Sequence, residues 1–396
     1  MPSFNCPIPH PERDPIVIVS SQRTAIGQFQ GQFSNYTAPQ LAAELIKAIL
    51  LQTKLSSDQI DEIILGCVLS AGIGQAPARQ AALFAELSPQ TGCTTINKMC
   101  GSGLKAIMLA HDLLQAGTNH IMIAGGMESM THAPYLLKKA RSGLRMGHTT
   151  LLDHMFLDGL EDAYEKDTLM GVFADRCAHH FGFSREQQDA FALESLFRSQ
   201  KATKHNLFKS EITAIHNIDS DELPLNAKPD KIPLLKPAFS PNGTVTAANS
   251  SGISDGASIQ LMMPASQAKK LGLKPLAQIL GHSTYSTAPA DFTIAPIGAI
   301  ELLLEKLKLK TNQIDLYEIN EAFAVVTLAA IQKLNLDNKK VNIHGGACSM
   351  GHPIGASGSR IVTTLLHALK SYELKTGIAS LCIGGGEAVA MAFEVL

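Results

Sequence analysis

The chain has 396 residues, of which 45% are hydrophobic and 17% charged, a composition that is typical of a globular protein and excludes a disordered one. This length allows two or three domains whose cores need neither disulfides nor metal. The net charge of -2, from 33 basic and 35 acidic residues, gives no reason to expect a nucleic-acid partner. The longest apolar stretches, such as Ala322 to Ile331, are too short to span a bilayer, so we expect no membrane association.

No two of the seven cysteines have the C-x-x-C spacing of zinc fingers and thioredoxins, so we expect no metal site. Scattered thiols in a large chain are typical of a reducing compartment. The N-terminal segment MPSFNCPIPHPERDP is polar and proline-rich, and it lacks the apolar core of a signal peptide. We therefore expect a cytoplasmic protein.

Strand-like and helix-like segments alternate in the first part of the chain. The β-branched run from Ile16 to Ser20 predicts a buried strand, and the run from Ile63 to Leu69 predicts another. Between them, apolar residues recur at helical spacing from Gln40 to Leu51. This alternation predicts an α/β fold whose sheets are covered by helices.

Residues 131–245 differ from the rest because they carry much of the charge and a cluster of prolines between Pro224 and Pro241. The capping-box spacing that starts at Ser184 predicts a helix as far as Ser199. We expect a loop-rich insertion that forms a lid or one wall of a site.

Two segments of the chain resemble each other. Residues 100–128 and 355–387 both run from Ser-Gly through a basic residue, Lys105 or Arg360, into an amphipathic helix and then an apolar strand that ends in Gly-Gly. Coincidence between two common βαβ units is the alternative explanation. We favour a duplication, which predicts two similar halves in a pseudo-symmetric core, with the insertion between them.

Cys100 lies in INKMCGSGLKA, between a predicted strand and a predicted helix. A thiolate there faces the positive end of the helix dipole, which is expected to lower its pKa. The small residues that follow leave backbone amides open to an oxyanion. Taken alone, the pattern fits a nucleophile about as well as it fits a buried structural cysteine.

Glycines crowd residues 344–358, HGGACSMGHPIGASG, which suits a loop that closely approaches a ligand or another backbone. This loop presents His352, whose neutral imidazole could take the proton of a nearby Cys100 thiol. Cys382 closes a predicted strand before Gly384 in CIGGGE, where a thiol can act as acid or base, although Gly-Gly-Gly is also an ordinary turn. Asn320 follows another predicted strand and can orient a water or a carbonyl, although a turn-forming Asn is the commoner case.

Together these segments resemble the thiolase family, which transfers acyl groups between a cysteine and coenzyme A. The resemblance runs from about Pro15 to Leu396 through NKMCGSGLKA, GGMESM, TVTAANSSGISDGA, NEAFA, GHPIGASGSR and CIGGG, in the family's order, and is closest to acetyl-CoA acetyltransferases. It implies two repeated α/β domains in a five-layer αβαβα arrangement. Residues 1–130 and 246–275 form the N-terminal half, residues 131–245 a loop domain that contributes to CoA binding, and residues 276–396 the C-terminal half.

The resemblance also implies a role for each site residue. Cys100 is the acylated nucleophile and His352 activates it, while Cys382 exchanges protons with the substrate carbon and the leaving group. One oxyanion hole is formed by His352 and a water held by Asn320, and the other by the amides of Cys100 and Gly384. The positions that match the tunnel for coenzyme A and the acyl group are Ser251, Leu160, Met170, Ala247, Ala322 and Phe323.

Several residues depart from the family's pattern, among them Cys348-Ser349-Met350 in place of a more aliphatic triplet. His344 stands where Asn is usual, and Phe292 stands where Met is common and so could reshape the acyl pocket. Leu169 replaces a common His, and Glu387 a residue that is more often apolar. Leu225 replaces an Arg that would meet the adenine end of coenzyme A. These changes bear on acyl length and coenzyme affinity and leave the catalytic residues intact.

The resemblance implies acetyl-CoA C-acetyltransferase activity, which condenses two acetyl-CoA to acetoacetyl-CoA and CoA, or the reverse, through an acyl-cysteine with ping-pong kinetics. Small acyl-CoA molecules are the substrates, no cofactor is permanently bound, and the protein forms a homodimer or homotetramer. One alternative is a degradative 3-ketoacyl-CoA thiolase of longer chain preference, and another is a non-catalytic acyl-CoA-binding protein. A ketoacyl synthase fits less well because its site has no second cysteine like Cys382.

Overall fold

The computed structural model describes residues 14–396, which fold into two similar halves and a segment inserted in the first. The elements of the first half are β1 (Ile16–Arg23), β2 (Gly27–Gln28), α1 (Ala38–Thr53), β3 (Glu62–Gly66), α2 (Pro77–Phe84), β4 (Gly92–Ile96), α3 (Ser102–Gln115), β5 (Met122–Ser129), β8 (Ser254–Pro264) and α7 (Ala265–Lys270). Those of the second are β9 (Ala277–Ser286), α8 (Ala295–Leu307), β10 (Leu316–Ile319), α9 (Ala324–Leu334), α10 (Ala347–Met350), α11 (Ile354–Ser371), β11 (Thr376–Ile383) and β12 (Glu387–Val395).

The two halves repeat one strand arrangement. In the first, the order is β4-β3-β5-β8-β1, with parallel pairing among β4, β3 and β5 and antiparallel pairing to β8 and β1. In the second, the order is β10-β11-β12-β9, with the same change from parallel to antiparallel. A parallel bridge from Tyr317 to Val341 marks the fifth position. The duplication is thus confirmed, because the two similar sequence segments form α3–β5 and α11–β11.

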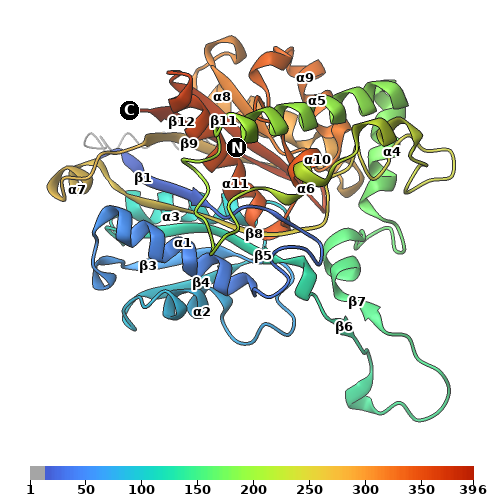
Figure 1. Ribbon diagram of the computed structural model, residues 1–396, viewed down its shortest axis with the longest axis horizontal. Coiled ribbons are helices and arrows are strands. Elements are labelled where there is room, and N and C mark those ends of the chain that lie inside the picture. The colour runs from blue at the N-terminus through green and yellow to red at the C-terminus, as the bar shows by residue number, and fades with distance from the viewer. Residues whose placement is uncertain (1–13) are drawn as a thin grey trace, which may run out of the picture.

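Five layers result, as predicted. In Figure 1 the blue and cyan half lies below the orange and red half, with α3 and α11 between the two groups of strands. Helices α1 and α2 cover the outer side of the first half, and α8 packs on the outer side of the second beside α9. The halves join through β1 and β9, which pair only at Val17 and Ile18.

Local signals set the helix starts. A capping box between Thr37 and Gln40 begins α1, slightly earlier than the apolar spacing predicts. Ser184 caps α5 (Arg185–Lys204) as predicted, but the helix continues beyond Ser199. Among the described residues, none of the helices has the length and apolarity that crossing a membrane requires.

The segment between β5 and β8 is rich in loops and also contains several helices, as the sequence predicts. Besides α5 it contains α4 (Met170–Phe181), α6 (Glu222–Asn226) and a short hairpin of β6 (Tyr135–Leu136) and β7 (Leu152–Asp153). Figure 1 shows this hairpin and its connecting loop projecting away from the body of the protein. The helices α5 and α6 instead pack against α10, just before the loop that carries His352.

Glycines allow the first turns of α3 and α11 to touch. A Cβ at Gly103 would lie 2.8 Å from the backbone nitrogen of Ser359, and a Cβ at Gly358 would overlap the backbone nitrogen of Leu104. Both obstacles are backbone atoms, so a side chain could be accommodated only if one helix moved. This contact fixes the relative position of the two helix N-termini.

Replacing Gly358 with alanine should therefore lower the free energy of unfolding by about 3 kcal/mol, the upper end of the usual cost of overpacking. Chemical denaturation measures it. The matched control is Gly117→Ala, at a left-handed position with open space around it, where backbone strain alone should cost about 1–2 kcal/mol. Equal losses in the two variants would contradict the close contact.

Candidate active site

A strained turn between β4 and α3 carries Cys100. Met99 has a left-handed backbone conformation (φ 46°), which costs a residue other than glycine about 1–2 kcal/mol. The Ser102 hydroxyl holds the turn by accepting a hydrogen bond from the Lys98 N–H at 2.8 Å and donating one to the Met99 carbonyl at 2.6 Å. Cys100 consequently lies just before the first turn of α3.

The end of β11 meets this turn. The backbone N–H of Gly384 donates a hydrogen bond to the sulfur of Cys100, and the Cys382 thiol is close enough to Cys100 for their charges to interact. One residue of this group comes from the first half of the protein and two come from the second. The site is therefore formed across the interface between the halves.

Burial dominates the electrostatics of both thiols. It raises the pKa of Cys100 to about 11, even though the Gly384 N–H favours the thiolate. Burial first, and then the charge of Cys100, raise the pKa of Cys382 well above its usual value. The predicted lowering of the Cys100 pKa by the helix dipole is therefore wrong, because removing a thiolate from water costs more than the amide dipoles return.

His352 is held as a neutral base. The Ser357 hydroxyl donates its one hydrogen to the Pro353 carbonyl at 2.9 Å, so at the 2.5 Å contact with His352 it must accept a hydrogen bond from Nδ1–H. The tautomer therefore has a free lone pair on Nε2, an atom that is buried and has no hydrogen-bond partner among the described residues. Burial, and then the charge of Arg360, lower the pKa of His352 to about 3.

Asn320 offers a second buried polar atom without a partner. Its backbone N–H donates to the Ser380 carbonyl at 3.0 Å, which fixes the residue at the end of β10. Its Oδ1 accepts a hydrogen bond from Arg360 at 3.4 Å, while Nδ2 has no partner among the described residues. Arg360 thus connects Asn320 with His352, and the free amide can donate to a water or a substrate oxygen.

A largely apolar cavity of about 600 Å³ lies beside these residues, a volume in the range of small-molecule sites. A Cβ at Gly384 would lie 3.8 Å from Met170 Sδ on its wall, so one wall of the cavity lies next to Gly384, the residue whose N–H faces Cys100. Ala322 does not line it but accepts a hydrogen bond from the Ser251 N–H at 3.0 Å. The other five predicted tunnel residues line the cavity: Leu160, Met170, Ala247, Ser251 and Phe323.

A second hollow lies next to this cavity. It has a volume of about 380 Å³, shares Leu223 and Ala247 with the first, and has Lys228 and Lys231 in its lining. Two lysines three residues apart in a proline-rich segment resemble any solvated surface, so nothing in the sequence marks them as functional. The apolar cavity is thus continued by a hollow that has two lysines in its lining.

The residues that depart from the family pattern lie in different parts of the structure. His344 is buried between the rings of Phe208 and Tyr372, and so it is a core residue. Leu169 lines the apolar cavity. Glu387 accepts a hydrogen bond from Lys98 at 2.6 Å, which ties the start of β12 to the turn that carries Cys100.

Comparison with known proteins agrees with this architecture. Residues 16–266 match the model of the thiolase N-terminal domain, and residues 273–395 that of the thiolase C-terminal domain. A probable acetyl-CoA acetyltransferase from Dictyostelium discoideum is 45% identical, covering 96% of this chain and 94% of its own. An acetyl-CoA acetyltransferase from Pseudomonas aeruginosa is also 45% identical, covering 95% and 98%. The crystal structure of an Ascaris suum thiolase in complex with coenzyme A superposes with a TM-score of 0.93 at 40% identity, covering 96% of this chain and 100% of that one.

The two pKa values predict that Cys100 is a neutral thiol and His352 a neutral imidazole at pH 7, and that they do not form a thiolate–imidazolium pair. Because the proton leaves Cys100 only as the pH approaches 11, its alkylation by iodoacetamide should accelerate about tenfold per pH unit between pH 7 and 9. Peptide mass spectrometry measures the rate, with Cys100→Ser identifying the label at this position. A rate independent of pH in this range would mean that the ion pair forms without substrate.

Proposed function

This chain belongs to the thiolase family, and we propose that it condenses two acetyl-CoA molecules to acetoacetyl-CoA and CoA and catalyses the reverse thiolysis. As a thiolase it is an acyltransferase that uses coenzyme A thioesters. The observation that carries the proposal is the pair of interacting thiols, Cys100 and Cys382, beside the Gly384 amide. A nucleophile and a separate proton carrier are what a carbon–carbon condensation needs.

The first half-reaction uses Cys100 and His352. His352 Nε2 takes the thiol proton, and the sulfur attacks the carbonyl carbon of acetyl-CoA. The amides of Cys100 and Gly384 stabilise the oxyanion, because Gly384 N–H already donates toward this sulfur. The carbon–sulfur bond to CoA then breaks, the CoA sulfur takes a proton from Cys382, and an acetyl group remains on Cys100.

The second half-reaction uses Cys382, Asn320 and His352. The Cys382 thiolate left by the first step removes a proton from the methyl group of a second acetyl-CoA. The enolate oxygen is stabilised by His352 Nε2–H and by a water bound to Asn320 Nδ2, two buried nitrogens whose hydrogen bonds the protein leaves unmade. The enolate carbon attacks the acetyl group, acetoacetyl-CoA forms, and the Cys100 thiolate recovers a proton from His352.

The two hollows suit the two ends of coenzyme A. The larger, apolar cavity lies next to Gly384 and fits the pantetheine arm. The smaller hollow has Lys228 and Lys231 in its lining and fits the phosphates. These two lysines supply positive charge in place of the family's Arg, whose position is taken here by the exposed Leu225. The chemistry above is complete with protein side chains, so we propose that no resident cofactor takes part in it.

The acyl end of the site supports a short substrate. Phe292 is 3% exposed and packs in one apolar cluster with Phe173, Phe323 and Cys382. The rings of Phe292 and Phe323 are 6.5 Å apart, edge to face. Aromatic side chains thus fill the space beyond the second thiol, where a longer acyl chain would have to lie. This favours acetoacetyl-CoA over the longer 3-ketoacyl-CoA of a degradative thiolase.

Two further proposals concern the protein's surroundings. The described cysteines are unpaired, which supports a reducing compartment such as the cytoplasm. The projecting β6–β7 segment exposes apolar side chains, including Met146 at 98%, and such a surface supports association of two or four copies of the chain. Neither property enters the chemistry above.

Separate loss of the two thiols tests the mechanism. Cys100→Ser should form no acetyl adduct after incubation with acetyl-CoA and should lose all turnover, because its hydroxyl is not ionised at neutral pH. Cys382→Ala should still be acetylated on Cys100, while thiolysis of acetoacetyl-CoA falls by about 10²–10⁴-fold. Mass spectrometry and absorbance assays on the same preparations measure both. Wild-type turnover in Cys382→Ala, or an adduct elsewhere than Cys100, would refute the assignments.

Changing Phe292 tests the acyl length. Phe292→Ala should raise kcat/KM for a six-carbon 3-ketoacyl-CoA relative to acetoacetyl-CoA by about 10-fold, the value of two extra buried methylenes. Phe292→Met keeps most of the volume and should change the ratio less. Phe183→Ala, at the partly buried side of the same cluster, is the control. An unchanged ratio in Phe292→Ala would place the acyl chain elsewhere.

A further inference from the structure

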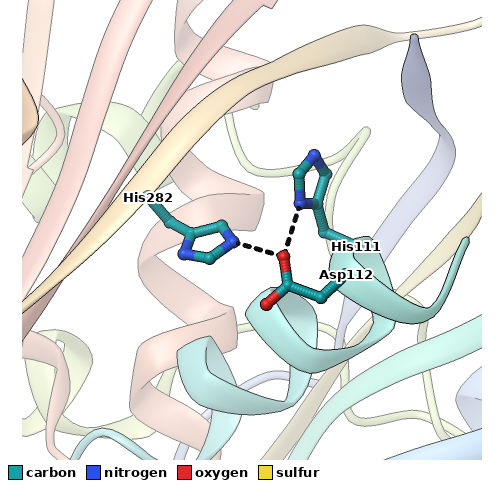
Figure 2. Close-up of side chains that lie close together, drawn as sticks. All are labelled: His111, Asp112 and His282. Carbon is teal, nitrogen blue, oxygen red and sulfur yellow. Dashed lines mark hydrogen bonds and ion pairs between the residues drawn. The ribbon is translucent and has the colours of Figure 1, made fainter. Parts of the chain in front are cut away.

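His111 and Asp112 on α3 and His282 on β9 converge where the two halves of the protein meet. Figure 2 shows both imidazole rings directed at the Asp112 carboxylate, with dashed lines to the same oxygen. Asp112 Oδ1 lies 3.3 Å from His111 Nδ1 and 2.9 Å from His282 Nε2. One nitrogen or oxygen from each residue lies within 4.8 Å of the others. The sequence analysis did not find this cluster, because Asp112 and His282 are 170 residues apart.

The separations suit a small metal ion. Zinc binds imidazole nitrogen at about 2.0–2.1 Å and carboxylate oxygen at about 2.0–2.2 Å, so in a tetrahedral site neighbouring ligand atoms lie about 3.3–3.5 Å apart. The 3.3 Å distance from His111 Nδ1 to Asp112 Oδ1 already has this value, and the 2.9 Å distance from His282 Nε2 would have to lengthen by about half an ångström. The two imidazoles would also need to approach each other, and their rings are in edge-to-face contact with centroids 5.2 Å apart.

The surroundings leave access for an ion and a water. The imidazoles are mostly buried, with 15% and 14% of their side chains exposed, whereas the Asp112 side chain is 56% exposed. A hollow of about 500 Å³ opens at the cluster. Burial also lowers the pKa of His111 and His282, which favours the neutral imidazole that binds metal.

We propose that His111, Asp112 and His282 bind one first-row divalent transition-metal ion, for which Zn²⁺ is the best match, with solvent water completing the coordination. Two imidazoles and one carboxylate are a ligand set of such ions, whereas Mg²⁺ and Ca²⁺ prefer oxygen. The ion would fasten α3 of the first half to β9 of the second, which otherwise pairs with β1 at only two positions.

The site is separate from the acyl-transfer chemistry. His111 lies nine residues after Ser102, which is about 13 Å along the axis of α3. None of the three residues lines the cavity beside the thiols. A bound ion should therefore raise thermal stability and leave the rate of thiolysis unchanged.

Two lysines oppose the ion. Lys306 donates a hydrogen bond to the His282 carbonyl at 3.2 Å, and its charge acts on both imidazoles. Lys105 acts on His282 as well. The single negative charge of Asp112 is opposed by the two lysine charges. Binding therefore depends on the bonds between the metal ion and the two imidazole nitrogens. Lys306→Gln, which retains a hydrogen-bond donor but loses the charge, should consequently bind the ion a few-fold more tightly.

The test uses the full-length protein in a Cys100→Ser background, titrated with ZnCl₂ by calorimetry and with CoCl₂ by absorption spectroscopy. We expect one ion per chain and a cobalt spectrum without a thiolate charge-transfer band. His282→Ala and the isosteric Asp112→Asn should each weaken binding by at least about 10–100-fold, the effect of removing even an outer-shell partner. His120→Ala, at an exposed histidine beyond α3, should bind like its parent.

A second measurement separates metal binding from folding. Circular dichroism, and thiolysis rates in the wild-type cysteine background, show whether each variant is folded, and ZnCl₂ should raise the melting temperature of the parent but not of folded Asp112→Asn. Equal affinity in the parent, His282→Ala and Asp112→Asn overturns the proposal. A thiolate band in the cobalt spectrum, or no bound ion in the parent, overturns it as well. Thiolysis serves only as a check of folding, and circular dichroism provides that check if the protein has no such activity.

Discussion

The site depends on the contact between the first turns of α3 and α11. Gly103 and Gly358 allow the two helix backbones to touch in the central layer. One residue separates Cys100 from the start of α3, and one residue separates His352 from the start of α11. Each helix belongs to a different copy of the duplicated unit. Neither half of the protein therefore forms the site by itself. A rigid backbone contact thus fixes the proposed nucleophile of one half relative to the proposed base of the other.

The same packing removes water from the reacting groups. Burial keeps Cys100 a thiol and His352 a neutral base, with pKa values of about 11 and 3. Charge separation between them is therefore unfavourable before a substrate arrives. In the proposed mechanism it becomes favourable when the thioester carbonyl accepts the negative charge near the amides of Cys100 and Gly384, because oriented dipoles stabilise such a charge.

Some polar groups around the site have all their hydrogen bonds made, and others lack a partner. The Ser357 hydroxyl is fully engaged and thereby fixes the tautomer of His352. Arg360 is buried beside Glu318 and Asn320, and it brings a positive charge close to the enolate position. Among the described residues, His352 Nε2 and Asn320 Nδ2 have no hydrogen-bond partner, and neither does Arg360 Nη1. A buried polar atom without a partner costs free energy in the empty protein, and a hydrogen bond made when substrate binds would recover that cost.

The sequence by itself determined the elements and the duplication, because backbone conformation and apolar spacing are encoded by near neighbours. The roles of the residues around the thiols were implied by the resemblance to thiolases and remain a proposal. The strained turn before Cys100 and the glycine loop around His352 are such local features. The tertiary structure alone decided the direction of the Cys100 pKa shift, which follows from how many atoms exclude water from the thiol. It also placed Ala322 behind the cavity wall, Lys228 and Lys231 at a second hollow, and His282 against Asp112. These outcomes depend on long-range packing, in which residues far apart in the chain exclude water from one another and bring charged groups together.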